Sequence, residues 1–243
     1  MINDSLIILA AGLSSRMKKS VSSKNLSKRS IEQANSRDKG LIGIDKNGRP
    51  LIHYLLINAK IAGFKVIYLV IGQNSDSFKS YFDENKYDGL DIEFAVQYLE
   101  KNKVKPSGTA DALFQAITQF PILKSSNFCV CNSDNLYSAK ALRSIRSTSF
   151  SNAFISYDKS FLNFSSEKVS SFSILKLNEN GYLVNILEKP TAKDFDLFKD
   201  SGGKIRVSMN LFKFNGSVFY DYLKNCPFDV LRNEKELPTA VLN

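Results

Sequence analysis

Residues 6–17 read LIILAAGLSSRM, an apolar run that leads into a turn of small residues and then to an arginine. The run predicts a buried strand at Leu6–Ala10, because consecutive large aliphatic side chains suit the interior of a sheet. Ala11 and Gly12 let the backbone approach a phosphate closely, and consecutive N–H groups in such a turn can bind an anion. The stretch therefore predicts a strand followed by a phosphate-binding turn, although a lone glycine also fits the plain end of a strand.

Beyond this stretch, short apolar or β-branched runs alternate with segments of helical period, and NENG at residues 178–181 is typical of a hairpin turn. We expect strands at Leu6–Ala10, Val66–Ile71, Ile92–Gln97, Phe128–Cys131, Ala153–Tyr157, Phe172–Leu177, Tyr182–Leu187 and Val207–Phe214. We expect helices at Leu51–Ala62, Asp76–Phe82, Thr109–Phe120, Ala139–Ile145 and Ser217–Lys224. This alternation predicts a single α/β domain over residues 1–243, with a sheet that is parallel in its first half and mixed in its second.

The composition is that of an ordinary globular protein, since 43% of the 243 residues are hydrophobic and 23% are charged. It excludes a disordered chain, a collagen, a coiled coil and a disulfide scaffold. The three cysteines lack zinc spacing, and we expect all of them to be buried core residues. We also expect His53, the sole histidine, to be a structural residue on a helix, which leaves no His-rich metal site and no Ser-His-Asp triad.

The net charge of +9 is concentrated in one segment. Residues 16–39 hold eight basic and two acidic residues, so this segment carries 8 − 2 = +6 of the total. Because the rest is nearly balanced, nucleic acid is not an expected partner, and residues 17–38 are expected to form a flexible basic loop. No apolar stretch is long enough for a membrane span or a signal peptide, so we expect a cytoplasmic protein.

The stretch LAAGLSSRM at residues 9–17 resembles the signature loop of the sugar-phosphate nucleotidyltransferases, a superfamily that also includes cytidylyltransferases and molybdenum-cofactor guanylyltransferases. Further resemblances follow in the order in which the family has them. They are KGLIGI (39–44), GRPLI (48–52), GTADAL (108–113), NSDN (132–135), EKP (188–190) and VSMN (207–210). The resemblance covers nearly the whole chain and implies a Rossmann-like three-layer α/β/α fold with a predominantly parallel mixed sheet.

The resemblance also implies a role for each matching residue. Arg16, Lys39 and Lys189 would be the catalytic cations, Asp134 would bind Mg²⁺, and Glu188 and Asn210 would contact a sugar. The nucleotide-binding residues would be Ala10, Ala11, Gly12, Gln97, Gly108 and Thr109. Taken by themselves, the long cations also fit a solvated surface, Asp134 also fits a helix cap or turn, and Gly108 and Thr109 also fit a helix start that Thr109 caps.

The implied reaction joins a nucleoside triphosphate to a sugar 1-phosphate, giving a nucleotide-sugar and pyrophosphate. A phosphate oxygen is the nucleophile, so catalysis needs positioning and charge neutralisation rather than a histidine base. This agrees with a sequence that has one histidine.

Two departures from the family pattern leave alternatives open. The segment between Arg16 and Lys39 is longer than in better-known members, and no residue can be assigned as a second metal ligand. The chain therefore fits either a fragment or an unusually short member. The alternatives are a cytidylyltransferase acting on phosphocholine or another small alcohol phosphate, and a non-catalytic nucleotide-sugar-binding module.

Overall fold

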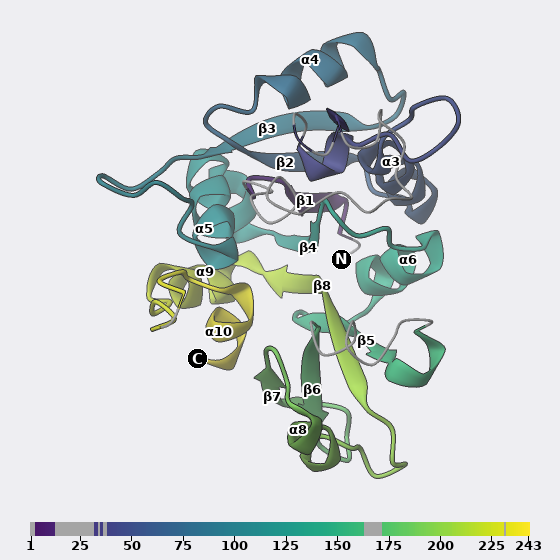
Figure 1. The fold of residues 1–243 in the computed structure, drawn as a ribbon, viewed down its shortest axis with the longest axis vertical. Helices are drawn as coiled ribbons and strands as arrows, with labels where there is room; N and C mark the ends of the chain where they lie inside the picture. The colour runs from purple at the N-terminus through teal and green to yellow at the C-terminus, as the bar shows by residue number, and fades with distance from the viewer. Residues whose placement is uncertain (1–2, 13–31, 34, 36–37, 163–171, 231) are drawn as a thin grey trace.

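A mixed sheet forms the centre of the computed structural model, which describes residues 3–12, 32–33, 35, 38–162, 172–230 and 232–243 (Figure 1). Within these residues the strands are β1 (Ser5–Leu9), β2 (Val66–Gly72), β3 (Asp91–Gln97), β4 (Asn127–Asn132), β5 (Ala153–Asp158), β6 (Ser173–Leu177), β7 (Leu183–Leu187) and β8 (Arg206–Asn215). The main path of the sheet runs β3-β2-β1-β4-β8-β6-β7, and β5 pairs with β8. The basic loop expected at residues 17–38 lies almost wholly outside the described residues.

The strands β1 to β4 are parallel, and β1, β2 and β4 are buried on both faces. Alternate side chains of each strand enter two separate cores: Ile8 and Leu69 pack into one, whereas Ile7 and Val70 pack into the other. Cys129, Cys131 and Cys226 are also buried in these cores, as expected. Burial on both faces explains why the sequence shows continuous apolar runs here instead of an alternating pattern.

Helices cover both faces of this parallel region, so the expected three-layer α/β/α fold is confirmed. One face is covered by α3 (Leu51–Ala62), α4 (Asp76–Glu84) and α6 (Ala139–Ser147). The other face is covered by α5 (Thr109–Gln119), α9 (Gly216–Lys224) and α10 (Leu237–Leu242). Figure 1 shows α5, α9 and α10 on one side of the sheet and α3 and α6 on the other.

The remaining strands extend the sheet with antiparallel pairs. The carboxyl-terminal half of β8 pairs with β4, and its amino-terminal half pairs with β6. β6 and β7 form the expected hairpin, whose turn is closed by bonds between Asn178 and both Tyr182 and Gly181. Because the long strand β8 belongs to both regions, it brings the hairpin to the edge of the parallel sheet (Figure 1).

All thirteen expected strands and helices are present, with ends that differ from the expected ones by at most two residues. Among the described α-helices, the short α8 (Ala192–Leu197) was not expected. His53 lies on α3, where its Nδ1 is 2.9 Å from the Tyr87 hydroxyl, which agrees with a structural role. Among the described helices, none is long and apolar enough to cross a membrane.

Candidate functional site

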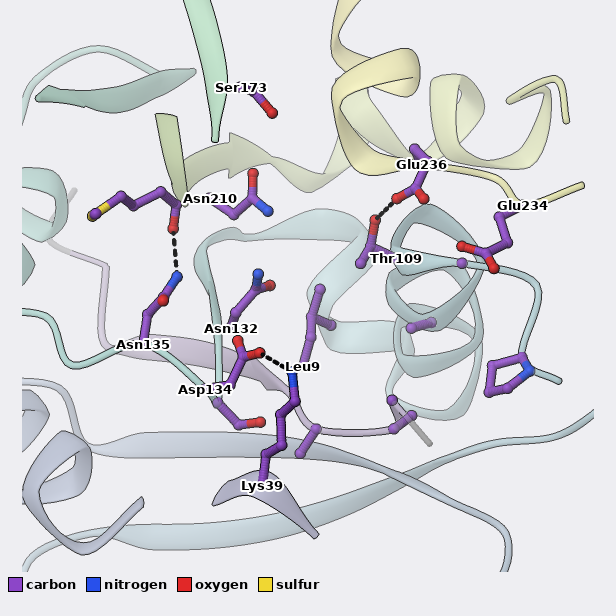
Figure 2. Close-up of a pocket in the computed structure, with 18 of the residues that line it drawn as sticks. Leu9, Lys39, Thr109, Asn132, Asp134, Asn135, Ser173, Asn210, Glu234 and Glu236 are labelled. Atoms are coloured by element: carbon purple, nitrogen blue, oxygen red, sulfur yellow. Dashed lines mark hydrogen bonds and ion pairs between the residues drawn. The ribbon is translucent and has the colours of Figure 1, made fainter. Parts of the chain in front are cut away.

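A cleft of about 840 Å³ lies where β1 and β4 end, and it is also lined by the open end of the β6–β7 hairpin and by the segment before α10, at Ser173, Glu234 and Glu236 (Figure 2). Ligands of open α/β sheets bind at the carboxyl ends of the parallel strands. Of the twelve residues that the resemblance implies, the eleven described ones all line this cleft: Ala10, Ala11, Gly12, Lys39, Gln97, Gly108, Thr109, Asp134, Glu188, Lys189 and Asn210. Arg16 lies outside the described residues.

The turn after β1 forms one wall of the cleft. Ala10 remains tied to the sheet through its N–H, which donates to the carbonyl oxygen of Val70 at 2.8 Å. Ala11 is buried, whereas Gly12 is exposed, and a Cβ atom added to Gly12 would meet no described atom within 4 Å. Packing within the described residues therefore does not demand a glycine here, and the turn leaves open space beside its backbone.

Asp134 and Lys39 face each other across the floor of the cleft. Asp134 follows β4, Lys39 begins the 3₁₀ helix Lys39–Leu41, and Lys39 Nζ lies 3.2 Å from Asp134 Oδ2. Both side chains are 42% exposed, so water and ligands can reach the pair. Asp134 is not a helix cap, because α6 begins later and its cap is Ser138.

The side-chain oxygens at and beside Asp134 suit an Mg²⁺ ion that a bound substrate would also coordinate. Asn132, Asn135 and Asp134 line the same part of the cleft, and Mg²⁺ prefers oxygen ligands of this kind (Figure 2). Among the described residues, no group of three His, Cys, Asp or Glu side chains could hold a metal ion without help. The site therefore fits Mg²⁺ bound through one carboxylate and completed by substrate phosphates and water.

A buried tyrosine that the sequence analysis missed connects this floor to β8. The Tyr137 hydroxyl donates to the carbonyl oxygen of Met209 at 2.6 Å, and it accepts from Asn135 Nδ2 at 3.2 Å and from the Asn132 N–H at 3.3 Å. Burial raises the pKa of Tyr137 well above its usual value, so the hydroxyl keeps its proton. Tyr137 thereby fixes the loop that carries Asp134 relative to the strand that carries Asn210.

Two residues of the hairpin side have left-handed backbone conformations that are uncommon outside glycine. The φ angle is +51° at Lys189 and +55° at Asn210. The Asn210 side-chain oxygen Oδ1 is buried and has no hydrogen-bond partner among the described residues. A buried acceptor without a donor is costly, and strained residues concentrate at functional sites, so this wall is a candidate ligand-binding surface.

Arg232 and Glu236, which the sequence analysis also missed, join the hairpin to the opposite wall. Arg232 Nη1 lies 2.8 Å from Glu188 Oε2 and 2.9 Å from Glu236 Oε1. Thr109 Oγ1 donates to Glu236 Oε2 at 3.1 Å and accepts from the Leu237 N–H at 2.8 Å. Burial and the charge of Glu188 raise the pKa of Glu236, whereas Arg232 opposes this shift.

Gly108 and Thr109 do begin a helix, but Thr109 is not its cap, since the N-cap of α5 is Gly108. Gly108 has a φ of +104°, and an added Cβ atom would collide with the backbone of Lys235. Lys235 also accepts a hydrogen bond from the Ala110 N–H at 2.9 Å. The glycine is therefore required by the close approach of the segment before α10, whether or not a base also approaches it.

The chain is similar to a solved structure described as "The Crystal Structure of UDP-glucose pyrophosphorylase complexed with UDP-glucose", with a TM-score of 0.71 and 17% identity over 99% of this chain and 86% of that one. This likeness shows a shared fold. No curated protein matches the chain. The sequence profile described as nucleotidyl transferase matches residues 34–237, which confirms the resemblance seen in the motifs: the chain belongs to the nucleotidyl transferase family.

Proposed function

We propose that this nucleotidyl transferase acts with Mg²⁺ and joins a nucleoside monophosphate unit to a sugar 1-phosphate, releasing pyrophosphate. The observation that carries the proposal is the convergence of the eleven described motif residues on one cleft at the carboxyl edge of the parallel sheet. They come from chain segments up to 200 residues apart (Ala10 to Asn210), and the sequence order of the motifs does not by itself bring them together.

Each side of the cleft has a distinct part in this reaction. On the sheet side, Ala11, Gly12 and Lys39 would hold the triphosphate, and Mg²⁺ held by Asp134 would neutralise charge on the phosphates. On the hairpin side, Lys189 would hold the phosphate of the sugar 1-phosphate. A phosphate oxygen of that substrate then forms a bond to the α-phosphorus, while the bond from the α-phosphorus to the pyrophosphate oxygen breaks.

The hairpin side favours a sugar over a small alcohol phosphate such as phosphocholine. Asn210 lines the cleft with a side-chain amide and Glu188 with a carboxylate, and both groups suit the hydroxyl groups of a sugar. Recognition of a quaternary ammonium uses several aromatic rings, and Phe172 is the one aromatic residue among the described residues that line the cleft.

The test is release of pyrophosphate by the purified protein in the presence of Mg²⁺. The nucleotides are the four ribonucleoside triphosphates and thymidine triphosphate. Each is combined with a panel of sugar 1-phosphates and with phosphocholine. We expect release with at least one sugar 1-phosphate and none without an acceptor. Release with phosphocholine alone would support the cytidylyltransferase alternative. Nucleotide binding in calorimetry without any pyrophosphate release would instead indicate a binding module.

A further inference from the structure

The side-chain amide of Gln97 is held by two groups that can only accept hydrogen bonds. Gln97 ends β3 and is 2% exposed, and its Nε2 lies 2.7 Å from Asp111 Oδ2 and 3.1 Å from the carbonyl oxygen of Gly108. A carboxylate and a carbonyl have no proton to donate. Both partners therefore require the Nε2 group of Gln97 as their donor, so Nε2 must face them and Oε1 must point away from them.

This arrangement leaves one end of Gln97 for a ligand. The amide nitrogen has two hydrogens, and the two acceptors use both of them. Gln97 lines the cleft, and no described group donates to its oxygen Oε1. Gln97 can therefore accept a hydrogen bond from a ligand in the cleft, but it has no N–H left to donate to one.

Asp111 is itself held in place and does not line the cleft. It lies in the first turn of α5, where the helix dipole favours a negative charge, and only 8% of its surface is exposed. Gln115 Nε2 donates to the same Asp111 oxygen at 2.9 Å, and the Gln115 side chain also bonds the N–H and carbonyl groups of Tyr98. Asp111 thus links Gln97 to a rigid junction between α5 and the end of β3.

We propose that Asp111 is a positioning residue that determines base selectivity, because it fixes Gln97 so that the amide oxygen faces the base of the nucleotide. The proposal rests on the proposed function, since it assumes that a nucleoside triphosphate occupies the cleft with its base beside Gln97. The base that is selected must then donate an N–H to Gln97 Oε1. If the amide could turn over, Gln97 would offer a donor instead and would accept the opposite base pattern.

Bases of the same size differ in where they carry hydrogen-bond donors and acceptors, and an amide of fixed orientation distinguishes these patterns. Uracil has a donor N–H at position 3 and an acceptor at position 4, and cytosine has the reverse; guanine and adenine are reversed in the same way at positions 1 and 6. A fixed acceptor opposite position 3 or 1 therefore suits uracil or guanine, whereas one opposite position 4 or 6 suits cytosine or adenine. A site with an oriented polar group rejects the reversed pattern strongly, because a buried group is left without its partner. The enzyme is therefore expected to discriminate within one size class, either UTP from CTP or GTP from ATP.

Asp111→Leu and Asp111→Asn separate positioning from packing. Leucine keeps the branched shape but accepts no hydrogen bond, whereas asparagine can still place an oxygen against Gln97 and Gln115. Gln119→Leu is the matched control, because Gln119 also bonds the backbone of β3 from α5, at Val96, but does not contact Gln97. The measurement is kcat/KM for each of the four ribonucleoside triphosphates, and KM for the sugar 1-phosphate, with thermal unfolding to verify that each variant folds.

Asp111→Leu is expected to reduce the discrimination within the preferred size class by about tenfold or more, the scale of one hydrogen bond to a charged group. Asp111→Asn and Gln119→Leu are expected to keep the wild-type ratio of the two kcat/KM values, and KM for the sugar 1-phosphate should stay unchanged in all three variants.

An unchanged ratio in a folded Asp111→Leu variant would overturn the proposal, as would equal losses of kcat/KM for all four nucleotides. If Asp111→Leu does not fold, loss of the ratio in Asp111→Ser replaces it as the supporting result, and retention of the ratio there overturns the proposal. Failure of the proposed function looks different, because the wild-type protein would then release no pyrophosphate from any triphosphate.

Discussion

Lys39 Nζ lies 3.2 Å from Asp134 Oδ2, so the residue proposed to hold Mg²⁺ already has a cation beside it. Both side chains are 42% exposed, and ion pairs in such positions contribute no more than about 1 kcal/mol because water screens them. The pair can therefore open at small cost when phosphates and Mg²⁺ enter the cleft. In this arrangement Lys39 competes with the metal for Asp134 in the free protein and is then available to a phosphate in the complex.

Replacing Lys39 with methionine separates these two effects. Without nucleotide, Lys39→Met should bind a divalent cation more tightly than the wild type, by at most about fivefold, because the competing ammonium is gone. Turnover should fall at the same time, because a phosphate loses its cation. Titration of Mn²⁺ followed by electron paramagnetic resonance measures the first effect, and pyrophosphate release measures the second. Weaker Mn²⁺ binding in this variant would argue against competition for Asp134.

Asp134→Asn should lower kcat by at least about 100-fold, the scale of losing one group that stabilises charge in the transition state. Stability should change little, because Asp134 is half-exposed and does not cap a helix. Asp196→Asn is the matched control, since Asp196 also pairs with a lysine, at 2.7 Å, but lies on α8 away from the cleft. Near-normal turnover in a folded Asp134→Asn variant would remove the metal assignment.

The sequence predicted the long elements of the fold because their signals are local. The helix Leu51–Ala62 agrees with the structure at both ends, since Pro50 precedes its first turn and Gly63 ends it in a left-handed conformation. The short helix α8 escaped prediction because six residues are too few to show a helical period. The Thr191–Asp194 capping box was the available signal for α8.

The candidate site was predictable where a residue follows a strand and belongs to a motif, as Asp134 does. It was not predictable where a residue acts through a distant contact. Arg232 reaches Glu188 across 44 residues of chain, and Tyr137 reaches Met209 across 72. Nothing in the sequence near Gly108 shows that its neighbour is Lys235, and the sequence pattern of α5 does not show that Asp111 holds Gln97.

Asn210→Gly should stabilise the protein and weaken sugar binding. Glycine removes a buried acceptor without a described partner and adopts the +55° φ angle without strain, whereas its flexibility in the unfolded chain opposes part of the gain. The net expected change is an increase of about 1 kcal/mol in the free energy of unfolding, measured with urea, together with a higher KM for the sugar 1-phosphate.

Asn102→Gly is the comparison for this variant. Asn102 has a φ of +69° but does not line the cleft, so its replacement should leave KM unchanged. Loss of stability in Asn210→Gly would show that the strand needs the asparagine for its own folding.

Arg232→Gln should raise the KM for the sugar 1-phosphate by about tenfold, because Glu188 loses the charged partner that orients it. KM for the nucleoside triphosphate should change much less. Arg206→Gln is the control, since Arg206 pairs with Asp200 at 2.9 Å and has the same exposed fraction, 27%, but does not line the cleft. Equal increases of both KM values would indicate a general loss of structure.

The same variant should change how stability depends on pH. The pKa of Glu236 is raised by burial and by Glu188, and Arg232 lowers it, so removing Arg232 should raise this pKa further. A carboxyl whose pKa is higher in the folded state contributes stability that is fully present below its unfolded pKa and is lost as the pH rises through the folded pKa. The difference in Tm between Arg232→Gln and the wild type should therefore be small below pH 4.5, which is the ordinary pKa of Glu236, and should continue to grow above it.

The control Arg206→Gln should behave differently. Its affected partner, Asp200, has a pKa lowered from 3.8 by backbone hydrogen bonds and by Arg206, so the difference in Tm between Arg206→Gln and the wild type should already be complete near pH 4.5. A flat difference for Arg232→Gln between pH 4.5 and 7 would mean that Glu236 is not the group that Arg232 holds ionised.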